Sequence, residues 1–151
     1  MTKESHLLIG ATTGVIFCNW EPFMIGGILA GSMAPDVIER IVALNDQRTF
    51  WKIHRKFTHW WGVWAGILLL LLFKTPIPIL QINTFMSFFV IGALIHIACD
   101  SLTKTGVPFL NPFKPGYGLK LIKTRSKEEY IIVASYLIFA GVIVLLPLYW
   151  K

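Results

Sequence analysis

Two pairs of polar residues stand at spacings suited to binding a metal ion. His54 and His59 are five residues apart, and His96 and Asp100 are four apart. Residues at i and i+4 of a helix share one face, so the second pair would project together. That pair ends the otherwise apolar stretch 85–100, where burying such groups is costly and marks a functional site. A metal ion would offset the cost, because zinc-like metals accept imidazole nitrogen and carboxylate oxygen.

The composition indicates that these residues lie in a membrane protein. Of the 151 residues, 55% are hydrophobic and only 15% are charged, whereas soluble domains have about 25% charged residues. Apolar runs lie at 7–18, 23–34, 60–73, 85–99 and 130–150. We therefore expect one all-α domain over residues 1–151, a polytopic bundle of four to five membrane helices.

The net charge of +6 is unevenly distributed and suggests an orientation. The basic residues gather between the second and third runs and between the fourth and fifth. The positive-inside rule then predicts that the N-terminus and both basic loops are cytoplasmic. The surplus is interpreted as topology and contact with membrane lipids, and nucleic acid is not expected as a partner because no aromatic residues interleave with the basic ones. The oligomeric state is left open.

Local signals divide the first half of the chain. Pro35 predicts the end of the second helix, and Asp36 followed by Glu39 predicts the cap of a separate amphipathic surface helix over 37–44. Ser126 with Glu129 predicts the start of the last helix. The segment 105–118 is rich in proline and glycine, so we expect an irregular loop that covers the end of the fourth helix.

On this topology six candidate metal ligands reach the cytoplasmic face. They are His6, Asp36, His54, His59, His96 and Asp100. Zinc is the expected metal, as one or two ions. Each residue also has a simpler explanation. Asp36 could be only a helix cap, His96 and Asp100 only a hydrogen-bonded pair that closes a helix end, and His59 only an interfacial side chain, while His6 is the weakest candidate ligand.

The same motifs resemble a known family. The stretches 5–8, 34–36, 54–59 and 96–100, continued by 102–108, are similar to the YdjM-type family of inner-membrane metal-dependent hydrolases. That family is in turn distantly similar to zinc-dependent phospholipase C and P1 nuclease. The resemblance implies metal ligation by His6, Asp36, His54 or His59, His96 and Asp100, and a place in the bacterial inner membrane. This chain differs in having Ile38 where family members often have a second Asp.

Together these features predict a metal-dependent hydrolase acting on a phosphoester such as a phospholipid or lipid-linked phosphate. Asp36 or Glu39 would serve as general base, and Arg55 and Lys56 would hold the headgroup phosphate. A metal or cation transporter, a haem protein with paired histidines, and a non-catalytic protein with a structural metal remain as alternatives.

Overall fold

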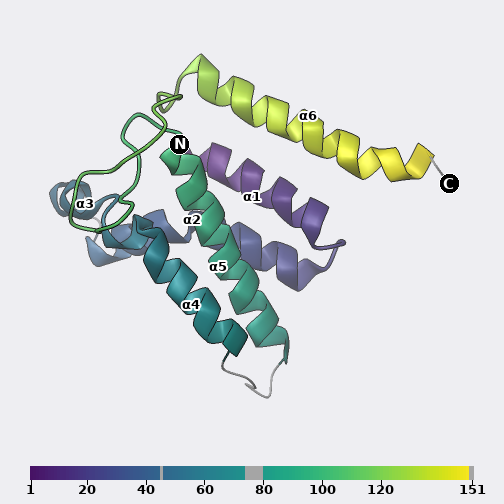
Figure 1. Ribbon diagram of the computed structural model, residues 1–151, viewed down its shortest axis with the longest axis horizontal. Helices are drawn as coiled ribbons and strands as arrows, with labels where there is room; N and C mark the ends of the chain where they lie inside the picture. Colours follow the sequence, from purple (N-terminus) through teal and green to yellow (C-terminus); the bar gives the residue numbers. More distant parts are fainter. Residues whose placement is uncertain (45, 74–79, 150–151) are drawn as a thin grey trace.

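The chain folds into helices that diverge from one polar end. The computed structural model describes residues 1–44, 46–73 and 80–149. Within these ranges there are six α-helices, one short 3₁₀ helix and no strand, which confirms the all-α prediction (Figure 1). The elements are α1 (Lys3–Phe17), α2 (Pro22–Val42), α3 (Gln47–Ile53), η1 (Phe57–His59), α4 (Trp61–Phe73), α5 (Leu80–Ser101) and α6 (Lys127–Tyr149).

Helices α2 and α5 form the central pair because glycines let their backbones touch. A Cβ added at Gly31 of α2 would lie 1.8 Å from the Phe89 carbonyl oxygen of α5. A Cβ at Gly92 of α5 would lie 2.3 Å from the Ile28 carbonyl oxygen of α2. This contact places the second half of α2 beside the end of α5.

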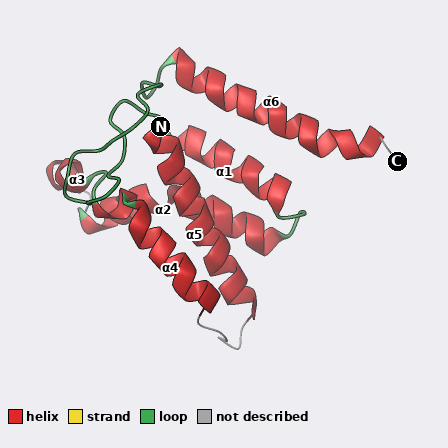
Figure 2. Ribbon diagram, in the orientation of Figure 1, coloured by secondary structure: helices red, strands yellow, loops and turns green. Residues whose placement is uncertain are grey.

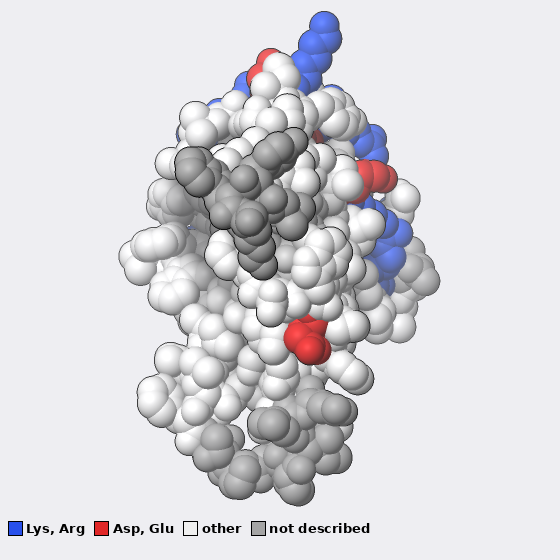
Figure 3. All heavy atoms as spheres, turned by 90° about the vertical axis from the view of Figure 1, so that its right-hand side faces the viewer, with Lys and Arg blue, Asp and Glu red and all other residues white. Residues whose placement is uncertain are grey.

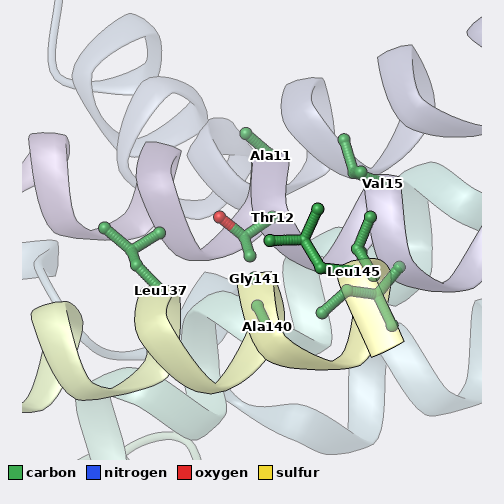
Figure 4. Close-up of a pocket in the computed structure, with 9 residues that line it drawn as sticks. Ala11, Thr12, Val15, Leu137, Ala140, Gly141 and Leu145 are labelled. Carbon is green, nitrogen blue, oxygen red and sulfur yellow. The ribbon is translucent and has the colours of Figure 1, made fainter. Parts of the chain in front are cut away.

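The other long helices pack around this pair. Helix α1 packs on α2, α4 packs on α5, and α6 packs on α1 (Figure 1). Trp64 of α4 and Val90 of α5 lie in one apolar core, and Ile9 of α1 and Val133 of α6 lie in another. Small side chains leave a hollow of about 420 Å³ between α1 and α6, lined by Thr12, Gly141 and their apolar neighbours (Figure 4).

The course of α2 differs from the prediction made from Pro35. Helix α2 runs unbroken from Pro22 to Val42 with Pro35 inside it, so the separate surface helix over 37–44 and the capping role of Asp36 are both wrong. Pro35 cannot donate a hydrogen bond to the Gly31 carbonyl. The buried packing against α5 nevertheless holds the helix together. Asp36 and Glu39 thereby lie three residues apart on one face of a continuous helix.

Two helices are long and apolar enough to cross a membrane. These candidate spans are Ile82–Ser101 and Lys127–Leu146, with mean hydropathies of 1.9 and 2.3, and Trp61–Phe73 is a shorter apolar helix. The predicted number of four to five spans stays a prediction. Figure 3 shows a face on which charged side chains are sparse and uncharged residues cover most of the surface.

The segment that joins the two candidate spans is irregular, as predicted. Residues 102–126 form turns beside the end of α5 (Figure 2). Val107 and Tyr117 exchange backbone hydrogen bonds of 3.0 and 2.8 Å across it. Gly106 has a φ of 63°, and a Cβ there would lie 2.4 Å from the Tyr117 carbonyl oxygen, so this close turn needs glycine. Helix α6 then begins at Lys127, directly after Ser126, where the last helix was predicted to start.

Candidate metal centre

The six predicted ligands meet at the polar end of the bundle. They come from α1, α2, the end of α3, η1 and α5: His6, Asp36, His54, His59, His96 and Asp100. Together with Glu39 they form two groups, and within each group all donor atoms lie within 4.8 Å of one another. One group is Asp36, Glu39, His54 and His59, and the other is His6, His96 and Asp100. The residues predicted to be ligands therefore lie close together, and both groups could hold a metal ion; that they bind one stays a prediction.

Four donor atoms link the two groups, and we call Asp36, His59, His96 and Asp100 the central cluster. His59 Nε2 lies 3.2 Å from His96 Nε2. Asp36 Oδ1 lies 3.4 Å from His59 Nε2 and 3.9 Å from His96 Nε2. Asp100 Oδ2 lies 3.8 Å and 3.9 Å from the same two nitrogens. Ligands about 2.1 Å from a tetrahedral ion lie roughly 3.4 Å apart, so the His59–His96 and Asp36–His59 spacings are those of neighbouring ligands on a zinc-like ion.

Several buried atoms around the cluster have no hydrogen-bond partner among the described residues. They are Asp36 Oδ1 and both ring nitrogens of His6. His6 stacks on His96 with ring centroids 3.7 Å apart, and its Nε2 lies 3.2 Å from Asp100 Oδ1. Buried polar atoms normally have partners. The unpartnered carboxylate oxygen among imidazoles is therefore what a cation site would present.

The backbone of α2 determines which nitrogen of His96 faces the cluster. His96 Nδ1 lies 2.7 Å from the Ser32 carbonyl oxygen. A carbonyl only accepts, so Nδ1 carries the hydrogen and Nε2 presents a lone pair toward His59. Such a second contact is the usual way in which a metal-binding histidine is oriented. Nothing in the residue types predicted this contact, because it is made by a backbone atom.

Glu39 orients two further histidines, His54 and His59. Its Oε2 accepts from His54 Nδ1 at 2.7 Å, and its Oε1 lies 3.0 Å from His59 Nδ1. The Thr58 hydroxyl also donates to Oε1. Ile38, by contrast, packs against the apolar core. The second carboxylate of α2 is therefore at position 39, one turn after Asp36, and the i, i+3 spacing was the signal for it.

Arg55 is held inside the site. Its guanidinium forms an ion pair of 2.9 Å with Asp100 and donates to Thr103 at 2.8 Å. It also contacts the Thr105 hydroxyl and the Gly106 carbonyl. These bonds join the turn after α3 to the segment after α5. The predicted role of Arg55 in holding a phosphate is not tested by this geometry and stays a prediction.

The charges around His59 favour its protonated form when no metal is bound. Burial lowers the pKa of His59, but the nearby carboxylates of Asp36 and Glu39 outweigh it and raise that pKa to about 9. Burial raises the pKa of Asp36, yet the neighbouring imidazoles lower it overall to well below its usual range. A proton on His59 thus occupies the position that a cation would take.

A cavity of about 890 Å³ borders the cluster, and we call it the basic cavity. Asp36 and His54 form part of its wall. Among the described residues that line the cavity, Asp36 is the only acidic one. Its cationic lining residues are Lys3, Arg40, Arg55, Lys56, Lys114 and Arg125. The loop 105–118, which was predicted to cover the site, contributes residues 113–116 to the wall of the cavity.

The fold and site define a helical membrane protein with a candidate metal centre at one end of the bundle. The chain belongs to the YdjM inner membrane protein family, whose model matches residues 1–150. It is therefore an inner membrane protein, as the motif resemblance predicted. No curated protein and no solved structure matches the chain.

Proposed function

We propose that this chain is a membrane-embedded metal-dependent hydrolase that acts on a phosphoester. The observation that carries the proposal is the central cluster, where a buried carboxylate oxygen without a hydrogen-bond partner among the described residues lies 3.4 Å from His59 Nε2. Two imidazoles and two carboxylates suit zinc or a similar divalent ion. A divalent ion held there would lower the pKa of a water ligand and neutralise phosphate oxygens. We place this site at the cytoplasmic face of a multi-pass protein.

The residues around the cluster would divide the remaining tasks. Asp36 borders the basic cavity and is partly accessible, so it can act either as a ligand or as the base that takes a proton from water. Glu39 has side-chain exposure of only 2% and accepts from two histidines, which favours an orienting role over its predicted role as base. Arg55 fixes the Asp100 carboxylate and the covering segment.

The distribution of buried polar groups favours a hydrolase over the alternative of a cation transporter. A transporter needs polar side chains along a path across the membrane. In the described ranges, the buried polar and charged side chains of α5 are His96 and Asp100, both at its site end. The middle of α5 buries Val90 and Ala93. The buried polar groups of α5 therefore gather at one end of the bundle.

Metal analysis and turnover test the proposal together. The purified protein should contain about one equivalent or more of a divalent metal, whereas the His96→Ala variant should lose most of it. Ser101→Ala is the matched control on the same helix, since among the described residues the Ser101 hydroxyl donates only to the Ala98 carbonyl. The wild type should hydrolyse phosphoester substrates in detergent, and a chelator should abolish this.

Two results would count against the proposal. Unchanged metal content in His96→Ala would remove the central cluster as the metal site. The second result is a combination: His96→Ala loses its metal and much of its stability, and the wild type hydrolyses no phosphoester. That combination would indicate a structural metal instead.

A further inference from the structure

The positive charge of the basic cavity is suited to binding an anion. Within the described chain, Lys3, Lys56 and Lys114 have no carboxylate within ion-pair distance. Arg55, in contrast, is occupied by Asp100. The free cationic side chains therefore surround the space in front of Asp36, and they can bind phosphate oxygens by charge-assisted hydrogen bonds.

A second hollow adjoins the basic cavity and is mainly apolar. It has a volume of about 390 Å³ and is lined by Phe109, Leu110, Asn111, Lys114 and Tyr117. Lys114 lines both spaces. A molecule bound across this lysine would meet cations on one side and apolar side chains on the other. That is the pattern expected for an amphiphile with a phosphate at one end.

The position of these hollows relative to the candidate spans indicates where the amphiphile comes from. The lining segments 105–117 and 124–125 lie between Ser101, which ends one candidate span, and Lys127, which begins the next. Large apolar side chains on these segments are exposed, among them Leu110 at 81% and Phe113 at 78%. Exposed apolar residues mixed with lysines are typical of the headgroup layer of a bilayer.

We propose that the basic cavity binds the phosphate of an anionic membrane lipid and that the hollow beside Lys114 receives the start of its acyl chain. Lys56 and Lys114 bind the phosphate in front of Asp36. The lipid's role as the substrate rests on the proposed hydrolase function, whereas its binding does not.

Binding of short-chain lipids by the full chain in detergent tests this inference. We expect dioctanoyl phosphatidate to bind at least ten times more tightly than dioctanoyl phosphatidylcholine or glycerol phosphate. The Lys56→Gln/Lys114→Gln variant should weaken phosphatidate binding at least tenfold. The control Lys52→Gln/Lys123→Gln removes the same charge from exposed lysines outside both hollows and should change it less than twofold. Circular dichroism checks that both variants are folded.

The outcomes separate this inference from the proposed function. Equal binding of glycerol phosphate, equal binding of phosphatidylcholine, or an unchanged affinity in the Lys56/Lys114 variant would each overturn the lipid inference. Metal-dependent hydrolysis of soluble phosphoesters without phosphatidate binding would overturn it and leave the hydrolase intact. Phosphatidate binding without metal-dependent turnover would support it and overturn the hydrolase.

Discussion

His59 and His96 direct their Nε2 atoms at each other across 3.2 Å, although 37 positions separate them in the chain. The Nδ1 atoms of both rings are already engaged, by Glu39 and by the Ser32 carbonyl. A single proton, carried by His59, can satisfy the facing pair when no metal is bound. Metal binding must displace that proton, so the geometry couples metal affinity to pH.

The first prediction concerns this pH dependence. Because the pKa of His59 is raised to about 9, the proton must be released whenever metal binds below that pH. The apparent metal affinity should therefore rise about tenfold per pH unit from pH 6 to 8 and level off near 9. Chelator competition at several pH values measures it. An affinity that does not change over this range would contradict the assignment of His59.

The same shift predicts the pH dependence of the metal-free protein. The folded-state pKa of His59 lies above its ordinary value of 6.5. Protonation of His59 therefore stabilises the fold fully below about pH 6.5, and this contribution is lost as the pH rises through 9. The melting temperature of chelator-treated protein should fall between pH 6.5 and 9.5. In His59→Gln this fall should be smaller.

The second carboxylate of α2 gives another prediction. Glu39→Gln keeps the size of the side chain but cannot accept from both His54 and His59 as a carboxylate does. We expect metal affinity to fall about 10- to 100-fold with the helical content unchanged. Glu4→Gln on the exposed side of α1 is the control. Isothermal titration with zinc measures both, and equal affinities would refute the orienting role of Glu39.

Arg55 should matter for the order of the covering segment. Arg55→Gln removes the ion pair with Asp100 and the bonds to Thr103 and Thr105, at a cost on the order of 3 kcal/mol for breaking a buried pair. Amide hydrogen exchange at residues 103–106 should accelerate. The exposed Lys52→Gln change should have no such effect. Unchanged exchange in Arg55→Gln would show that other contacts hold the segment.

Adding a methyl group at the contact between α2 and α5 should destabilise the protein. Gly31→Ala places a Cβ against the Phe89 carbonyl, so the helices must separate, at a cost of at least about 1–3 kcal/mol. Thermal unfolding in detergent should show a lower midpoint. Gly66→Ala is the matched control, since nothing lies within 4 Å of its Cβ. Equal midpoints for the two variants would contradict the close approach.

Much of the candidate site followed from spacing within single elements. The i, i+4 spacing placed His96 and Asp100 on one face of α5, where His96 Nε2 lies 3.9 Å from Asp100 Oδ2. Apolar runs located the long helices, and proline with glycine located the irregular segment after α5. These features depend on the helical period and on backbone chemistry, both of which are local.

Contacts between elements were decided only by the tertiary structure. Pro35 normally ends a helix, but packing of Gly31 against α5 keeps α2 continuous and carries Asp36 and Glu39 into the site. The partners of Glu39 and Arg55 come from segments 15 to 51 positions away. Which residue meets which across such distances depends on how closely two backbones approach, and no single segment contains that information.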